Sequence, residues 1–199
     1  MKTPRWKRAC DIAMATVLLV VLAPLLVFIA LAIFISSGAP ILFRQERIGL
    51  AGRPFTILKY RTMRPPRTAS EADPVGDAAR ITLVGRALRA MSLDELPQLI
   101  NVLVGEMSIV GPRPTLRDQV ERYTDFQRRR LLVRPGITGW AQINGRNSLA
   151  WSKRIELDVW YVEHLSVMLD TRIVFRTLPA LVRRDGVYGP DGINPDLDE

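Results

Sequence analysis

Two adjacent carboxylates, Asp94 and Glu95, are the residues of this 199-residue chain whose type and setting best suit chemistry. They lie within SLDELP, residues 92–97, in a region rich in arginine that follows one long apolar segment. Acids held among cations, on a protein tied to a bilayer, indicate chemistry on a phosphate group at the membrane surface. Neighbouring residues do not face each other within a helix, so the two carboxylates would converge on one reacting centre only at a helix start.

A purely structural interpretation exists for the same residues. The spacing of Ser92 and Glu95 also fits the S-x-x-E capping box, in which the glutamate side chain caps the backbone of a helix start. Pro97 removes the hydrogen bond back to the carbonyl of Leu93 and strains a regular helix at this point. Spacing alone therefore leaves both catalysis and capping open.

Basic residues flank this acidic pair in the sequence. Lys59 and Arg61 alternate at the end of an expected strand, which places both on one face. Arg86 and Arg89 are three positions apart on an expected helix just before the acids. Three more arginines lie in segments rich in proline and glycine: Arg113, Arg134 and Arg146. One such arginine is usually a solvated surface residue, but several in rigid loops favour phosphate binding, because a guanidinium pairs bidentately with phosphate oxygens.

Composition and missing motifs narrow the class of protein. The net charge of +8 favours a polyanionic partner, whether nucleic acid, anionic lipid or a phosphorylated substrate. Aromatic residues make up only 7% and do not interleave with the basic ones, which argues against single-stranded nucleic acid. His164 is the only histidine and Cys10 the only cysteine, so the sequence excludes a two-histidine metal site and an intrachain disulfide.

The apolar segment from Ile12 to Ile35 contains about 24 residues and no charge. That is long enough for a membrane helix, which needs about 18 apolar residues or more. Pro24 lies at its midpoint and should bend the helix, because proline removes a backbone hydrogen bond. Each half would then reach about one leaflet deep. Basic residues lie on both sides of the segment, so the sequence leaves a re-entrant helix and an ordinary kinked span open.

The remaining pattern predicts an α+β domain that is mostly helical and has a small β-hairpin. Residues 41–43 and 55–58 read as short strands joined by a glycine-containing loop at 49–52. Helical periodicity covers four further segments: 81–104 with interruptions at Ser92 and Pro97, 115–133, 151–164 and 170–184. The last of these is amphipathic and flanked by arginines, as expected of a helix lying at a membrane surface.

Four segments together resemble the bacterial sugar transferase family, the monotopic phosphoglycosyl transferases. They are FTILKYRTM (55–63), SLDELPQLINVLVGEMSIVGPRP (92–114), RPGITGWAQINGRN (134–147) and LDVWYV (157–162). The resemblance covers essentially the whole chain, including the apolar helix with its proline. The short length resembles the minimal members, such as the type that starts bacterial N-linked glycan assembly.

The resemblance implies transfer of a sugar-1-phosphate from a UDP-sugar to a polyprenol phosphate, usually undecaprenyl phosphate, with release of UMP. It also implies a re-entrant membrane helix at residues 1–37, a cytosolic catalytic domain at 38–199, and a location at the cytosolic face of the bacterial inner membrane. Anionic membrane lipid is a further expected partner, nucleic acid is not, and a homodimer is left open.

The resemblance also assigns roles to residues. Asp94 would be the nucleophile and a ligand of Mg²⁺, with Glu95 as a neighbouring acid–base or positioning group. The expected substrate-binding residues are Lys59, Arg61, Arg89, Arg113, Arg134, Gln142, Arg146 and Asp158. Two rival functions are left open: a membrane-tethered nucleic-acid-binding or scaffold protein, which the charge of +8 suggests, and a lipid phosphatase or diphosphatase.

Overall fold

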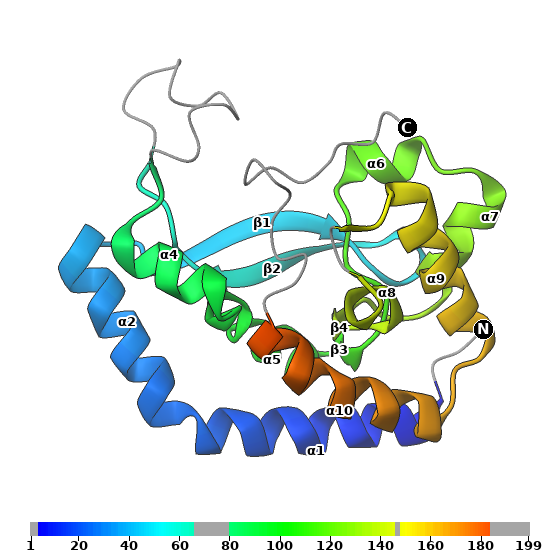
Figure 1. Ribbon diagram of the computed structural model, residues 1–199, viewed down its shortest axis with the longest axis horizontal. Helices are drawn as coiled ribbons and strands as arrows, with labels where there is room; N and C mark the ends of the chain where they lie inside the picture. Colours follow the sequence, from blue (N-terminus) through cyan, green and yellow to red (C-terminus); the bar gives the residue numbers. More distant parts are fainter. Residues whose placement is uncertain (1–3, 66–79, 146–147, 184–199) are drawn as a thin grey trace.

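The computed structural model describes residues 4–65, 80–145 and 148–183, with the backbone alone for residues 180–183. This part of the chain is mostly helical and contains two small two-stranded sheets (Figure 1). The predicted α+β class and the predominance of helix are therefore confirmed.

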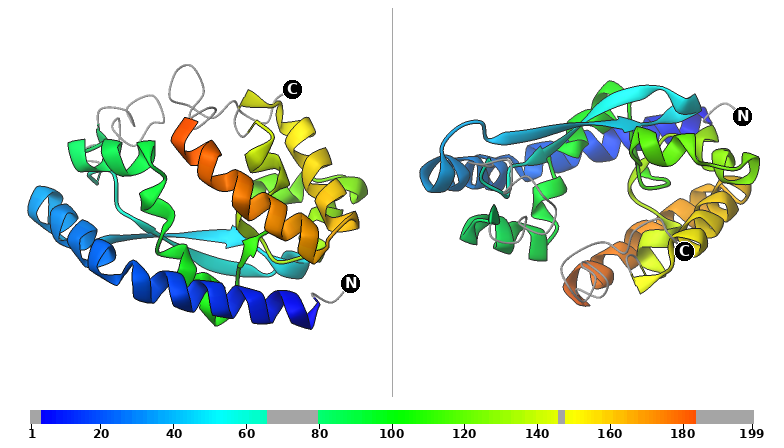
Figure 2. Two further views of the ribbon diagram at one scale, coloured as in Figure 1. Left: turned by 60° about the horizontal axis from the view of Figure 1, so that its bottom comes forward. Right: turned by 90° about the horizontal axis from the view of Figure 1, so that it is seen from above.

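The N-terminal apolar segment forms two helices, α1 (Arg5–Val21) and α2 (Ala23–Ser37), that meet at an angle of 63°. Pro24 lies in the first turn of α2, where an N–H has no partner within the helix, so α2 loses no hydrogen bond. Proline cannot, however, donate the backbone hydrogen bond that would continue α1 through this point. The bend therefore falls at Leu22, just before the proline, and the left view of Figure 2 shows it. Within the described residues no single helix meets the length and hydropathy needed to cross a bilayer, but the bent pair meets them jointly.

The N-terminal half of α1 packs into the globular part of the chain. The Asp11 carboxylate accepts hydrogen bonds from the Ser108 hydroxyl and the Ile109 N–H, both at 2.9 Å. Lys7, only 1% exposed, forms an ion pair with Asp170 at 2.6 Å. These buried polar contacts fix the direction in which the rest of α1 leaves the domain.

The predicted hairpin is confirmed and longer than expected. Strands β1 (Leu42–Ile48) and β2 (Pro54–Tyr60) pair antiparallel around a short turn, η1 (Leu50–Gly52). Asn101 binds the outer edge of β2, where its side chain accepts from the Leu58 N–H and donates to the Thr56 carbonyl. The hairpin is thereby attached to the helix that carries Asn101.

The predicted helical segment 81–104 is broken where the sequence suggested. It comprises α4 (Leu83–Ala90), a 3₁₀ turn η4 (Leu93–Glu95) and α5 (Gln98–Val104). Thr82 caps α4 by accepting from the Gly85 N–H at 2.9 Å. Gly85 lies so close to the end of the hairpin that a Cβ there would come within 2.0 Å of the Thr62 carbonyl oxygen.

The prediction of one helix over residues 115–133 is wrong. The segment forms three short pieces: α6 (Arg117–Glu121), α7 (Asp125–Arg128) and the 3₁₀ helix η5 (Arg129–Leu132). The physical reason lies at Thr124, whose backbone is extended and whose hydroxyl accepts from the Gln127 N–H at 3.3 Å. A capping threonine starts a new helix there instead of continuing the old one.

A second, parallel sheet was not predicted. It pairs β3 (Ser108–Val110) with β4 (Gly136–Thr138), strands of three residues each. Helices α8 (Trp140–Ile143), α9 (Trp151–Glu163) and α10 (Val167–Arg183) follow, which confirms the helices predicted at 151–164 and near 170–184. The main core gathers side chains from α5, α9 and α10, with Val102, Tyr161 and Ile173 fully buried.

Candidate active site

The acidic pair lies in a strained turn between two helices. Ser92 has left-handed backbone angles (φ 56°, ψ 21°), which are unfavourable for a residue with a Cβ. The turn η4 then carries Asp94 and Glu95, and Pro97 precedes α5. Ser92 makes no side-chain capping bond, and the Glu95 carboxylate is bound elsewhere. The capping-box alternative is therefore wrong, and the turn presents both carboxylates outside regular helix.

Glu95 is held by two cations. Its Oε1 atom accepts from Lys59 Nζ at 2.7 Å and from an Arg113 guanidinium nitrogen at 2.9 Å. Burial by itself raises the pKa of Glu95, but Arg113 and Lys59 outweigh that effect and hold the pKa well below its usual range. Glu95 is therefore ionised at any physiological pH, and this arrangement suits a positioning role better than proton transfer.

Asp94 has the opposite environment. Its carboxylate makes no side-chain hydrogen bond or ion pair within the part of the chain that the structure describes. Burial and the neighbouring charge of Glu95 raise the pKa of Asp94, against the opposing pull of Lys59, Arg89 and Arg113. Two adjacent acids with pKa values pushed apart are typical of active sites. An unpaired carboxylate of raised basicity can act as a nucleophile or a metal ligand.

Five of the predicted site residues come together here. Lys59 comes from β2, Arg89 from the last turn of α4, and Arg113 from the loop after β3, around Asp94 and Glu95. The Arg89 Nε atom donates to the Thr62 hydroxyl at 2.8 Å, which fixes the guanidinium beside the acidic turn. The cluster has three cations for two acids and therefore suits an anionic substrate.

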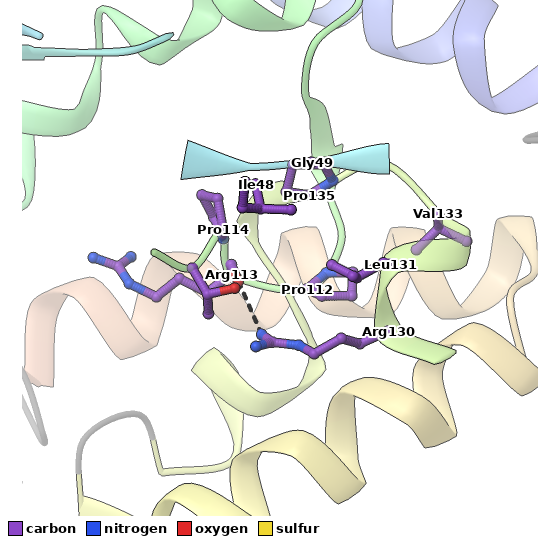
Figure 3. A pocket seen from close by; sticks show the side chains of 10 residues that line it. Ile48, Gly49, Pro112, Arg113, Pro114, Arg130, Leu131, Val133 and Pro135 are labelled. Carbon is purple, nitrogen blue, oxygen red and sulfur yellow. Dashed lines mark hydrogen bonds between the residues drawn. The ribbon is translucent and has the colours of Figure 1, made fainter. Parts of the chain in front are cut away.

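The loop that carries Arg113 is fixed from below by a buried ion pair. Arg130 donates to the Arg113 backbone carbonyl at 2.9 Å, to the Tyr123 hydroxyl at 2.6 Å and to the Asp158 carboxylate. The side chains of Arg130 and Asp158 are each only 3% exposed. Figure 3 shows the Arg113 guanidinium pointing away from Arg130, toward the other side of the loop. Asp158 thus acts on the site through Arg130, a residue that the sequence reasoning missed.

Three other predicted site residues are placed elsewhere. The Arg61 guanidinium donates to the carbonyls of Ser37 and Ala39 at the end of α2. Arg134 donates to the Gly105 carbonyl at 2.7 Å. Gln142 lies on α8, and the two polar atoms of its amide are buried without a partner in the described structure. Their substrate-binding roles stay predictions, and Arg146 lies outside the described residues.

A cleft beside the cluster contains two polar residues that the sequence reasoning did not select, Arg47 and Gln98. Its lining comprises Arg47, Ile57, Lys59, Glu95, Gln98, Arg113 and Pro114. The hairpin register places Arg47 opposite Phe55 and Phe43 opposite Lys59, so Arg47 and Lys59 share one face of the hairpin. Arg47 could have been selected from the sequence, because strand alternation and hairpin pairing place it on the same face as Lys59. No local sequence pattern points to Gln98.

The acidic turn supplies only part of the ligand set that Mg²⁺ requires. Among the described residues no group of three His, Cys, Asp or Glu side chains could cage a metal ion. Mg²⁺, however, is commonly bound through one or two carboxylates plus substrate phosphates and water. Asp94 fits that role because its carboxylate is unpaired, whereas Glu95 is already occupied by Lys59 and Arg113.

Comparisons with known proteins identify the family to which the chain is similar. The sequence profile of the family described as "Bacterial sugar transferase" matches residues 2–184. The chain is 46% identical over 181 residues to "Uncharacterized sugar transferase EpsL" of Bacillus subtilis (strain 168), which covers 91% of this chain and 89% of that protein.

Two further relatives have more specific names. The chain is 43% identical to "UDP-glucose:undecaprenyl-phosphate glucose-1-phosphate transferase" of Caulobacter vibrioides, over 92% of this chain and 72% of the relative. It is 37% identical to "Undecaprenyl-phosphate galactose phosphotransferase" of Salmonella typhimurium, over 92% of this chain but only 41% of that longer protein.

Proposed function

Because the chain belongs to the bacterial sugar transferase family, we propose that it transfers a sugar-1-phosphate from a UDP-sugar to a polyprenol phosphate, releasing UMP. The names of the relatives support undecaprenyl phosphate as acceptor and a hexose such as glucose or galactose in the donor. The observation that carries the proposal is an Asp94 carboxylate without an ion pair in the described structure, next to an ionised Glu95 that is ion-paired with Lys59 and Arg113.

We propose that the transfer proceeds in two displacements at phosphorus. A carboxylate oxygen of Asp94 attacks the phosphorus that bears the sugar, and the bond from that phosphorus to the oxygen of UMP breaks. An oxygen of the polyprenol phosphate then attacks the same phosphorus and displaces Asp94 as a carboxylate. Covalent catalysis of this kind divides one difficult step into two easier ones.

The cations offset the repulsion between the anionic carboxylate and the anionic donor. Lys59, Arg89 and Arg113 supply fixed positive charge around Asp94, which stabilises the charge that builds on phosphoryl oxygens. Glu95 holds Lys59 and Arg113 in place before the donor binds. Mg²⁺, held by Asp94 and phosphate oxygens, would supply Lewis-acid stabilisation of the departing phosphate.

We further propose that α1 and α2 enter and leave the cytosolic face of the bacterial inner membrane as a re-entrant pair. The 63° bend supports this, as do apolar side chains on α2 that are more than half exposed: Val27, Phe28, Leu31, Phe34 and Ile35. The amphipathic helix α10 exposes Met168 and Phe175 and is proposed to lie along anionic lipid. The acceptor phosphate would then meet the acidic turn at the headgroup plane.

Thiol labelling tests this topology. Cys10 is exposed near one end of the bent pair, and an Ala39→Cys variant adds a thiol near the other. With a membrane-impermeant maleimide, re-entry predicts that both thiols react from the cytosolic side only. Reaction of the two thiols from opposite sides would establish an ordinary span.

A UMP-release assay tests the function. Purified protein with undecaprenyl phosphate, Mg²⁺ and a panel of UDP-sugars that includes UDP-glucose and UDP-galactose should release UMP and form a lipid-linked sugar diphosphate. The Asp94→Asn variant should release none while unfolding at an unchanged temperature. Absence of UMP with every donor would reject the proposal, and release of inorganic phosphate from the lipid alone would favour a phosphatase.

A further inference from the structure

The cleft beside the acidic turn has more hydrogen-bond donors than its own acceptors satisfy. Arg47, at the end of β1, is partly buried there, and its guanidinium binds only the Gln45 side-chain oxygen, at 2.6 Å, within the described structure. Gln98, at the start of α5, is only 2% exposed, and its Nε2 atom has no partner in the described structure. A buried donor without an acceptor costs free energy. Gln98 Nε2 and the remaining N–H groups of Arg47 are therefore expected where a ligand supplies the acceptors.

The charge balance of the cleft indicates the nature of that ligand. Among the residues that the structure describes, three cations, Arg47, Lys59 and Arg113, line it with one carboxylate, Glu95, which already accepts from Lys59 and Arg113. Burial and the like charge of Arg113 lower the pKa of Arg47 to about 10, against the weaker opposing effects of Glu95 and Asp118. An anion with several acceptor oxygens would relieve both the repulsion and the unmet hydrogen bonding.

We propose that Arg47, from β1, and Gln98, from α5, bind the phosphate oxygens of a substrate next to Asp94. The guanidinium supplies a planar pair of donors and a fixed charge, and the amide Nε2 supplies a neutral donor. The inference rests on the proposed function for the identity of the substrate, but the anion site itself does not require turnover. The phosphate belongs either to the UDP-sugar donor or to the lipid acceptor, which share this chemistry.

The first experiment uses steady-state kinetics with both substrates varied. Arg47→Gln should lower kcat/KM by about 10- to 100-fold, the range expected when a hydrogen bond to a charged group is lost. The loss should appear as a raised KM for one of the two substrates, and that substrate is then identified as the one whose phosphate binds Arg47. The matched control is Arg44→Gln, which removes the same charge from an exposed position on the same strand. Equal kinetics for Arg47→Gln and Arg44→Gln would overturn the proposal.

Gln98 is tested separately because its contribution is neutral. Gln98→Met keeps the length and burial of the side chain but removes the amide donor. It should lower kcat/KM for the same substrate as Arg47→Gln by about 10-fold, with an unchanged unfolding temperature. A loss on the other substrate, or no loss, would mean that Gln98 does not share the site with Arg47.

Direct binding separates this inference from the proposed function. Isothermal titration with pyrophosphate should give measurable affinity for the wild-type protein and for Arg44→Gln, and at least 10-fold weaker affinity for Arg47→Gln. If the wild-type protein releases no UMP but this pattern holds, the function fails while the anion site stands. If UMP is released but Arg47→Gln binds pyrophosphate as the wild-type does, the anion site fails while the function stands.

Discussion

The Glu95 carboxylate lies 2.7 Å from the ammonium group of Lys59, and this contact separates the chemistry of two adjacent acids. Glu95 is held ionised by Lys59 and Arg113, whereas Asp94 has a raised pKa and no such partner in the described structure. The protein thus keeps one carboxylate as a structural anion and leaves the next one available for reaction. The ionised Glu95 in turn makes Asp94 more basic.

The first prediction concerns the pH dependence of activity. Asp94 must be ionised to attack, so activity is present above its raised pKa and is lost as the pH falls through it. Glu95→Gln removes a negative neighbour and ends the ion pairs that Lys59 and Arg113 make with Glu95, and both effects lower the pKa of Asp94. The acid limb of kcat/KM should therefore move to lower pH, although the maximal rate falls.

A control for this prediction is Glu156→Gln, which removes an exposed carboxylate of α9 that pairs with Lys153. Its pH profile should match that of the wild-type protein. An acid limb that stays in place or moves to higher pH in Glu95→Gln would contradict the electrostatic coupling of the two acids.

The second prediction concerns the buried pair of Arg130 and Asp158. Arg130→Met should lower the free energy of unfolding by about 3–5 kcal/mol, because it leaves Asp158 buried and uncompensated. The double change Arg130→Met/Asp158→Leu should recover much of that stability. Activity should stay low in both variants, since the Arg113 carbonyl has lost its donor.

The comparison is made by thermal or chemical unfolding together with the UMP assay. Lys153→Met, which breaks an exposed pair, should change stability by less than about 1 kcal/mol. Full activity in the stable double variant would mean that Arg130 does not position the Arg113 loop.

The third prediction concerns Gly85 in α4, which packs closely against the backbone of Thr62. Gly85→Ala places a methyl group 2.0 Å from the Thr62 carbonyl oxygen, so α4 must move away from the hairpin. Arg89 and the acidic turn at the end of α4 move with it, and overpacking of this kind costs about 1–3 kcal/mol. We expect Gly85→Ala to have a lower kcat and a lower unfolding temperature than the wild-type protein. Ala87→Ser, on the exposed side of the same helix, should keep the wild-type kcat and unfolding temperature. Equal behaviour of the two variants would contradict the close contact.

The sequence predicts those parts of the fold that depend on local patterns. The hairpin follows from short apolar strands around a glycine-containing loop, and the breaks near Ser92 and Pro97 follow from turn chemistry and a missing N–H. The parallel sheet of β3 and β4 was missed, because strands of three residues from distant segments leave no local periodicity. The helix predicted at 115–133 was wrong because apolar periodicity outweighed the capping threonine at 124.

The candidate site was predictable to a similar extent. Asp94, Glu95, Lys59, Arg89 and Arg113 were selected from sequence, and the structure brings them together. Arg130 and Gln98 were missed because their importance comes from burial and tertiary contacts. Arg61 and Arg134 were selected from their sequence motifs, but in the structure their guanidinium groups donate to backbone carbonyls away from the acidic turn.

The most direct test of the account is covalent labelling of Asp94 by the donor alone. Wild-type protein incubated with Mg²⁺ and a UDP-sugar carrying ³²P on the phosphate next to the sugar, without acceptor, should retain label on Asp94 and release one equivalent of UMP. Asp94→Asn should retain none, and added polyprenol phosphate should discharge the label from the wild-type protein. Release of UMP only when both substrates are present, with no labelled protein at any time, would contradict the covalent role of Asp94.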